Sequence, residues 1–342
     1  MNNKGSALIM VLVAVAIMIM TASVISVRFN KVFFTTQNSF YYDRARWYVD
    51  GIEGIIIKYM KDDFKKTPTK VYLGMNWAQE NQVIPLDEAV ISGSVSDEMA
   101  CLNINSLATD VVIEGLSEKE TQNQDSKFKT EKFPALVFNQ LLKTMGADDN
   151  LAETITDSAV DWLDVDSNTK SSYGAEDQYY MSLHVPYLTN QGLFYDKSEL
   201  RMIKGMTPEL YRRIEPMICA LPNTNFSINI NTLKRNQSPL LVALFLDHLD
   251  IEAAVSTITN RPEYGWDSSL GFFRMDGLES AAAEMNGLKT RINKSVVVNS
   301  KYFVANIKVS FDDEEYAFKT RFYREADTSL VVYQRVIGEL HE

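Results

Sequence analysis

The sequence is poor in cysteine and histidine, and this scarcity excludes several kinds of site. Its 342 residues contain two cysteines, Cys101 and Cys219, and three widely separated histidines. No CxxC pair and no Cys/His cluster occurs, which argues against zinc and iron–sulfur sites. The GxSxG, P-loop, GxGxxG and HExxH motifs are also missing, so nothing in the sequence indicates an enzyme.

Positive charge is scarce as well. The chain has 34 Lys and Arg residues against 45 Asp and Glu residues, a formal net charge of −11. Phosphate binding requires a cationic surface, so we do not expect nucleic acid as a partner. An apolar content of 46% and a charged content of 23% are ordinary for a globular protein. The length suits two domains, or one domain with a large insertion.

Charge, proline and glycine are all missing from residues 6–27. As a helix this segment would be ~33 Å long, which matches the hydrocarbon core of a bilayer. The first proline of the chain is Pro68. An apolar face with helical periodicity continues beyond the segment, formed by Ile52, Ile55, Ile56, Tyr59 and Met60. These features favour one helix of about 55 residues with its first half in a membrane over a cleavable secretory signal.

Alternating apolar and polar residues predict strands near both ends of the remaining chain. The first two are expected at 90–96 and 99–104, around a turn near Asp97; the others are expected at 301–311, 316–324 and 330–336, with a hairpin turn at 312–315. Roughly 190 residues of helical pattern separate the two groups, which indicates an insertion into a helix-plus-sheet domain. The predicted fold is therefore α+β: a long N-terminal helix, a small antiparallel sheet and a large all-α insertion.

An internal repeat and a hairpin motif mark the predicted insertion. Residues 102–107 (LNINSL) recur as 228–233 (ININTL), and we expect the Asn and Ser/Thr of each copy to cap a following helix. Residues 198–218 resemble a helix–hairpin–helix, with a turn at Gly205 and Thr207 as the N-cap of the second helix. Such a turn can bind DNA phosphates, but the acidity of the chain favours a helical packing unit.

The stretch 156–180 is rich in acidic residues. Asp164, Asp166 and Asn168 occupy positions 1, 3 and 5 of an EF-hand loop, but Thr169 replaces its glycine and the final glutamate is displaced. The spacing alone leaves two interpretations open: a calcium loop of another kind, or a solvated acidic loop.

The N-terminus and two internal blocks resemble a known family. A short leader ending at Gly5, followed by a long apolar helix, looks like the signal of a type IV pilin-like protein. Most members of this group carry Glu at the position where this chain has Met10. In lacking the glutamate, this chain resembles the K-type minor pseudopilin of the type II secretion system. The blocks DWLDxD…GAEDxYY (161–180) and LRMIKGMTPE (200–209), followed by CALP, match the same family.

This resemblance implies a set of site residues. A prepilin peptidase would cut between Gly5 and Ser6 and leave a methylated amine on Ser6. Family members bind calcium in the inserted domain, and the ligands implied here are Asp164, Asp166, Glu176 and Asp177, with Asp161 capping or orienting the loop. In an exported domain, the two cysteines are expected to form a Cys101–Cys219 disulfide rather than remain free thiols.

The resemblance also implies a domain order. It runs as a prepilin leader (1–5), a transmembrane helix (6–27), the helix continuation with the first strands (28–105), an inserted α-helical domain (106–290) and the C-terminal strands (291–342).

The implied function is structural. Such a protein would span the inner membrane once, with its soluble domain in the periplasm, at the tip of the pseudopilus. There it would initiate or cap the fibre and support export of folded proteins across the outer membrane. The implied partners are the I-type and J-type minor pseudopilins, the major pseudopilin and prepilin peptidase. The alternatives are a minor pilin of a type IV pilus and a membrane-anchored helix–hairpin–helix DNA-binding protein.

Overall fold

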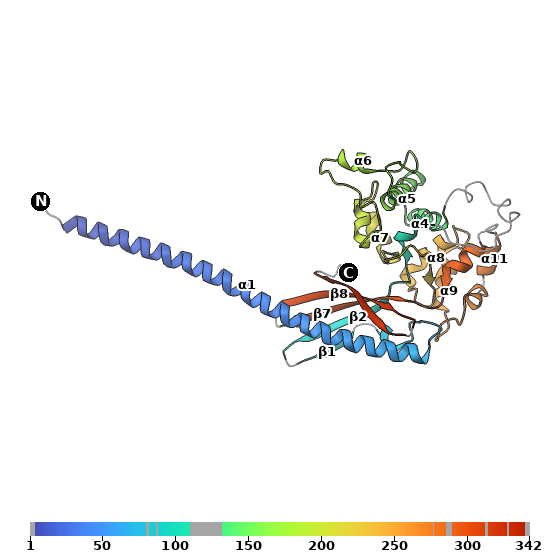
Figure 1. Cartoon of the computed structure of the whole chain (residues 1–342), viewed down its shortest axis with the longest axis horizontal. Helices are drawn as coiled ribbons and strands as arrows, with labels where there is room; N and C mark the ends of the chain where they lie inside the picture. The colour runs from blue at the N-terminus through green and yellow to red at the C-terminus, as the bar shows by residue number, and fades with distance from the viewer. Residues whose placement is uncertain are drawn as a thin grey trace.

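A single long helix dominates the computed structural model, which describes residues 4–79, 82–86, 88–109, 132–275, 277–284, 289–311, 314–326 and 328–338. Helix α1 (Lys4–Lys66) has 63 residues, and its first half projects away from the body of the molecule (Figure 1). Residues 8–36 of α1 are all exposed, so no part of the described chain buries this half. Of the proposed leader, residues 1–3 lie outside the described residues.

The second half of α1 packs on a sheet. Ala45, Val49, Met60 and Phe64 are buried against it, and Ile52 and Ile56 are partly buried with them. The expected apolar face is wrong in two members, because Ile55 and Tyr59 are 45% and 59% exposed. They lie beside the contact stripe, one helical position away from residues that touch the sheet.

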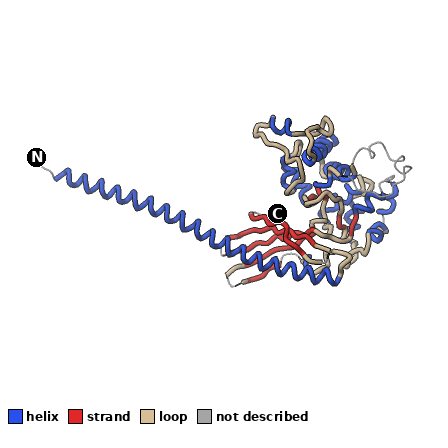
Figure 2. The backbone as a smooth tube through the Cα atoms, viewed as in Figure 1, coloured by secondary structure: helices blue, strands red, loops and turns tan. Residues whose placement is uncertain are grey.

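The sheet has five strands in the order β1-β2-β7-β8-β9 and is antiparallel throughout (Figure 2). Its strands are β1 (Gln82–Pro85), β2 (Val90–Asp97), β7 (Tyr302–Phe311), β8 (Glu314–Arg324) and β9 (Leu330–Ile337). The three C-terminal strands predicted from the alternating pattern are confirmed. In β7, every second residue is buried against α1, as the pattern requires. Part of the expected 312–315 turn, residues 312–313, lies outside the described chain.

An ion pair between a buried glutamate of α1 and a half-exposed arginine of β9 holds the helix to this sheet. Glu53 is 3% exposed, and its carboxylate accepts hydrogen bonds from Arg335 Nε and Nη2 at 2.9 and 2.6 Å. The hydroxyl of Thr320 donates to the same carboxylate at 2.7 Å. A charge buried in this way is tolerated because it is both paired and hydrogen-bonded.

The two strands expected around a turn near Asp97 are present, but the second is shorter than expected and the two do not pair with each other. Strand β2 pairs with β7, whereas β3 (Leu102–Asn103) pairs in parallel with β4 (Ile218–Cys219). The Asp97 carboxylate accepts hydrogen bonds from Ser300 and Thr232, which fastens the end of β2 to distant segments. Strand β1 was not predicted, because four exposed residues carry too little pattern.

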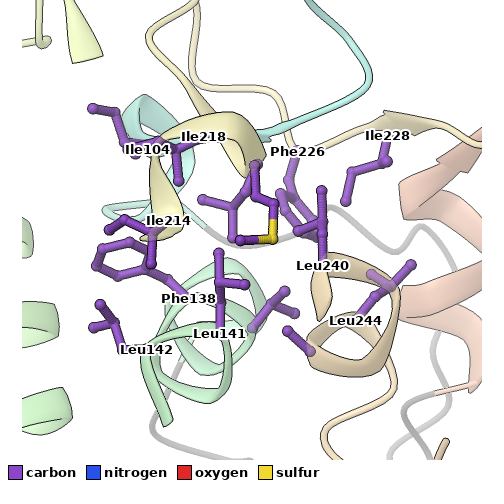
Figure 3. Close-up of a cluster of buried hydrophobic side chains, with 14 of the residues drawn as sticks. Ile104, Phe138, Leu141, Leu142, Ile214, Ile218, Phe226, Ile228, Leu240 and Leu244 are labelled. Atoms are coloured by element: carbon purple, nitrogen blue, oxygen red, sulfur yellow. The ribbon is translucent and has the colours of Figure 1, made fainter. Parts of the chain in front are cut away.

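Between β2 and β7 the chain forms a helical domain with short paired strands. Its elements are η2 (Ile104–Ser106), α4 (Phe133–Thr144), α5 (Asp149–Leu163), α6 (Asp177–Met181), η3 (Lys197–Met202), α7 (Pro208–Ile214), η4 (Glu215–Met217), β5 (Ile228–Asn229), η5 (Arg235–Gln237), α8 (Ser238–Leu244), α9 (Ile251–Thr259), α10 (Ser269–Phe273), α11 (Leu278–Glu284), α12 (Lys289–Ser295) and β6 (Val296–Val297). In its core α4 and α8 pack together, with Leu240 and Leu244 on α8, while Phe138 of α4 lies beside Ile214 of α7 (Figure 3).

Asn105 and Asn231 bind loops and do not cap a following helix, contrary to expectation; in the first repeat Asn103 caps the short η2, where its side chain accepts from Asn105 N. The Asn105 side chain accepts a hydrogen bond from Phe194 N at 2.7 Å and donates one to Phe194 O at 2.9 Å. In the second copy, the Asn231 side chain makes the same pair of bonds to Trp266 N and O, at 2.8 and 2.9 Å. Both asparagines are fully buried. Each side-chain amide therefore pairs with the backbone N–H and C=O of one loop residue, much as another peptide group would. These bonds hold the loop in place and satisfy the hydrogen bonding of the buried polar groups.

Covalent and ionic contacts join the helical domain to the sheet. Cys101 and Cys219 form a disulfide with a Cα–Cα distance of 5.8 Å; Cys101 directly precedes β3 and Cys219 is the last residue of β4. On β8, Arg321 donates to Glu98 at 2.8 Å and to Asp196 at 3.0 Å. Burial disfavours the charge of Arg321, but the two carboxylates outweigh it and raise the pKa of its guanidinium.

We predict that the double substitution Cys101→Ser/Cys219→Ser lowers the free energy of unfolding of the helical domain by about 2–4 kcal/mol, because the unfolded chain loses a 118-residue crosslink. Thermal unfolding in oxidising buffer measures this. A reducing agent should bring the unsubstituted protein to the stability of the double variant and leave the variant unchanged; equal stability of the two oxidised proteins would contradict the prediction.

Candidate metal centre

Three carboxylates meet where α5 ends and α6 begins. Ligand atoms of Asp161, Asp164 and Glu176 all lie within 4.8 Å of one another. Asp161 is on the last turn of α5, Asp164 is its C-cap residue, and Glu176 is the N-cap residue of α6. Asp161 and Glu176 are 0% and 4% exposed. Three acidic groups thus converge in a space that water barely reaches.

Several oxygens of this group have no hydrogen-bond partner among the described residues. These are Asp164 Oδ1 and both carboxylate oxygens of Glu176. A buried carboxylate oxygen without a partner is costly, and native structures usually satisfy it with a donor or a cation. The donor set is all oxygen, which is the set that hard cations such as Ca²⁺ prefer. The residues present therefore fit a bound divalent cation.

Asp161 also organises the loop between the two helices. Its carboxylate accepts hydrogen bonds from the backbone N–H groups of Lys170 and Ala175, both at 2.8 Å. A Cβ atom on Gly174 would lie 2.0 Å from Asp161 Oδ2, so only glycine allows this approach. The neighbouring Asp157 pairs with Lys170 Nζ at 2.7 Å and fixes the other side of the loop.

Like charges and burial disturb the ionisation of the group. Burial, reinforced by repulsion from Asp161, raises the pKa of Glu176 to about 7. Burial also raises the pKa of Asp161 to about 6, although two backbone N–H groups oppose the shift. The pKa of Asp164 is raised by burial and by Asp166. Without a cation, burial and mutual repulsion therefore make the ionised form of these carboxylates unfavourable.

The structure brings together two of the four ligands implied by the resemblance. Asp164 and Glu176 belong to the group. Asp166 instead accepts a hydrogen bond from the N–H of Asn168 at 2.7 Å. Asp177 accepts two from Thr189, which lower its pKa.

Asp161 was expected only to cap or orient the loop, and it lies in the group as well. The available signal was its helical i, i+3 spacing to Asp164, which places both carboxylates on one face of α5.

The hairpin motif packs against this centre. Lys204 Nζ donates to the carbonyl oxygens of Tyr173 and Gly174, both at 3.0 Å. Gly205 has φ +86°, and side chains of α5 such as Ile155 lie 3.2–3.3 Å from where its Cβ would be. The expected N-cap is confirmed, since Thr207 accepts from Leu210 N in α7. The turn of the hairpin motif is therefore covered by α5 and by the loop that contains Tyr173 and Gly174. This supports the interpretation of the motif as a helical packing unit.

Together, these features define a class of protein: a pilin-like subunit whose N-terminal helix is long and apolar enough to cross a membrane, with a helical domain inserted in its sheet. Family models for "Type II secretion system (T2SS), protein K" match residues 100–223 and 228–291.

Type II secretion system protein K of Aeromonas hydrophila is 34% identical over 98% of each chain. That of Pectobacterium carotovorum subsp. carotovorum is 33% identical over 98% of this chain and 97% of its own. A solved chain of the GspK-GspI-GspJ complex from enterotoxigenic Escherichia coli matches with a TM-score of 0.76 and 25% identity, over 89% of this chain and 99% of that one. The chain belongs to the type II secretion system protein K family and is a minor pseudopilin of that system.

We predict that Gly174→Ala destabilises the helical domain by about 1–3 kcal/mol, because the added methyl group would collide with the Asp161 carboxylate. Gly192→Ala is the matched control in the same region, since the nearest atoms to its added Cβ lie at an ordinary 3.7 Å. Thermal unfolding of the two variants checks this. Equal unfolding temperatures would show that the loop does not need the glycine.

Proposed function

We propose that this minor pseudopilin sits at the tip of a periplasmic pseudopilus and assembles there with I-type and J-type minor pseudopilins. The observation that supports this most strongly is the likeness, over 89% of this chain, to a chain solved within a GspK-GspI-GspJ complex. The major pseudopilin, as the body of the fibre, would lie beneath this group. The assembly would support export of folded proteins across the outer membrane.

The arrangement of the head suits a terminal position. The helical domain lies toward the end of the molecule opposite the free, N-terminal half of α1 (Figure 1). In a fibre of parallel, staggered helices, a further subunit would have to stack where this domain already is. The domain would therefore cap the fibre or start it, rather than be repeated along it.

In this proposal α1 passes once through the inner membrane and the head lies in the periplasm. Prepilin peptidase would cleave after Gly5 and leave Ser6 as the methylated N-terminus. The apolar side chain of Met10 would let α1 pack against partner helices without a buried carboxylate, which would need its own compensating charge.

The carboxylate group is proposed to hold a structural calcium ion. Asp161, Asp164 and Glu176 would supply side-chain oxygens to it, and nearby Asp166 would add negative charge. The ion would neutralise the repulsion that raises the pKa of Glu176. It would pin the α5–α6 loop and the hairpin that packs on it.

The tip position is tested in cells that overproduce the major pseudopilin and make long fibres. We expect gold-labelled antibody against the helical domain to mark only fibre ends, and the full-length protein in detergent to co-purify with its I-type and J-type partners. Label along the whole fibre, or a protein that stays monomeric with both partners present, would contradict the proposal.

We predict that Met10→Glu leaves the head folded but alters partner choice, because a carboxylate in the apolar bundle requires a neighbouring amine. Met10→Leu is the matched control and should behave like the unsubstituted protein. Co-purification with the I-type, J-type and major pseudopilins measures the change. An unaltered set of partners for Met10→Glu would refute the role given to this position.

To test for calcium, we predict that Glu176→Gln makes the protein more stable in the absence of the ion and less stable in its presence, each relative to the unsubstituted protein. Between pH ~4.5 and ~7 the folded state holds a proton on Glu176 that the unfolded state has released, so without metal the stability falls as the pH rises through this range. At pH 8 in EDTA, the variant should therefore unfold at a higher temperature than the unsubstituted protein. In millimolar calcium the order should reverse, because bound metal stabilises only the unsubstituted site.

Glu153→Gln, an exposed change on α5, should keep the full response to calcium. If Glu176→Gln gains as much stability from calcium as the unsubstituted protein, the ion does not bind at this group.

A further inference from the structure

A large cleft separates the sheet from the helical domain. Its volume is about 1160 Å³, and it is lined by β2, β7 and β8 on one side and by η3 and α7 on the other. Sites for small molecules usually measure ~300–1,000 Å³. The cleft is therefore large enough for a length of polypeptide.

Strand register explains the open floor of this cleft. Ser94, Asn306, Lys319 and Val336 form one row across β2, β7, β8 and β9. Residues on either side of them along each strand, such as Ile307, point to α1, so this row points to the opposite face. Small polar side chains dominate the β2 side of that face and leave a flat surface.

The cleft is basic although the protein is acidic. The residues lining it include seven Lys and Arg and four Asp and Glu, whereas the whole chain has 34 and 45. The basic ones are Lys197, Lys234, Lys308, Lys319, Arg201, Arg212 and Arg321, and the acidic ones are Asp97, Glu98, Asp196 and Glu215.

The acidic residues of the cleft are already engaged within the protein. Glu98 and Asp196 both pair with Arg321. Glu215 lies 3.5 Å from Lys197 Nζ. Asp97 is held by hydroxyl and amide donors, among them Ser300 and Thr232. Glu98 and Asp196 also attract Lys319 from a distance, but four carboxylates offset only part of the charge of the seven cations.

Two cations on opposite walls stay without a carboxylate partner among the described residues. Lys319, half-buried on the floor, makes no hydrogen bond or ion pair there; its burial and the nearby Arg321 lower its pKa. Arg201 on η3 is exposed and lies over the ring of Tyr211, 5.9 Å from its centre. A partly desolvated cation such as Lys319 is stabilised by an incoming anion, and the exposed Arg201 faces the same cleft.

We propose that the cleft binds an extended acidic segment of another protein, with carboxylates placed against Lys319 on the floor and Arg201 on the roof. The size of the cleft fits a peptide, its charge fits acidic side chains, and the serine and asparagine side chains of the floor can bond to a peptide backbone. Nucleic acid fits less well, because the remaining surface is strongly acidic. This site is independent of the calcium centre and of fibre assembly.

The test uses the full chain in neutral detergent and a fluorescein-labelled ten-residue peptide of alternating Glu and Ser, followed by fluorescence anisotropy. We expect binding that weakens as salt rises from about 50 to about 300 mM, and no binding of the same peptide with Gln in place of Glu. Lys319→Gln and Arg201→Gln should each weaken binding about tenfold, since each removes one charge-assisted bond. Lys58→Gln and Arg274→Gln, exposed changes outside the cleft, are the matched controls.

A charge-reversed pair, Lys319→Glu/Arg201→Glu, should instead bind the peptide with Lys in place of Glu. Hydrogen exchange should show protection by the Glu peptide in 302–324 and 197–214. Equal binding of the Glu and Gln peptides, unchanged affinity in both single variants, or protection confined to other segments would overturn the proposal. So would equally tight binding of an oligothymidylate of the same charge, because it would show a site for anions in general.

Discussion

The apolar half of α1 cannot be satisfied by its own chain, and the rest of the structure follows from this constraint. Residues 8–36 are all exposed in the described protein, and most of 8–27 are large aliphatic side chains. An exposed apolar surface of this size is unfavourable in water, whereas a helix in lipid satisfies its own backbone. The segment therefore belongs in a membrane or among other apolar helices. The sheet and the helical domain, which together form the folded head, must therefore be held by the second half of α1 alone.

This attachment uses polar contacts at each junction. Glu53 fixes α1 to the sheet through Arg335, and Arg321 fixes the sheet to the helical domain through Glu98 and Asp196. The disulfide lies at the same root. Apolar packing between such elements would tolerate sliding, whereas directional bonds select one orientation. A rigid head suits a subunit that must present one defined shape to its neighbours.

Local pattern predicted the elements that local physics determines. Uninterrupted apolar sequence and the distance to the first proline indicated α1, and alternation indicated β7, β8 and β9. Contacts between distant segments decide the parts of the fold that the local pattern did not predict. Strand β2 pairs across the insertion with β7, and Asn105 and Asn231 bind loops instead of capping helices. The acidic stretch identified the candidate metal centre, but not its members. Asp177 is bound by Thr189, a contact between distant residues that spacing does not reveal, whereas the i, i+3 spacing of Asp161 to Asp164 was the available signal that Asp161 belongs to the group.

The most direct test of the account is the intact mass of the native protein in fractionated cells. The account predicts a chain that begins at Ser6 with one added methyl group, found only in the membrane fraction and retained there after alkaline extraction. A chain that begins beyond residue 27 and is recovered in the soluble periplasmic fraction would contradict it, because the head would then work without the apolar helix.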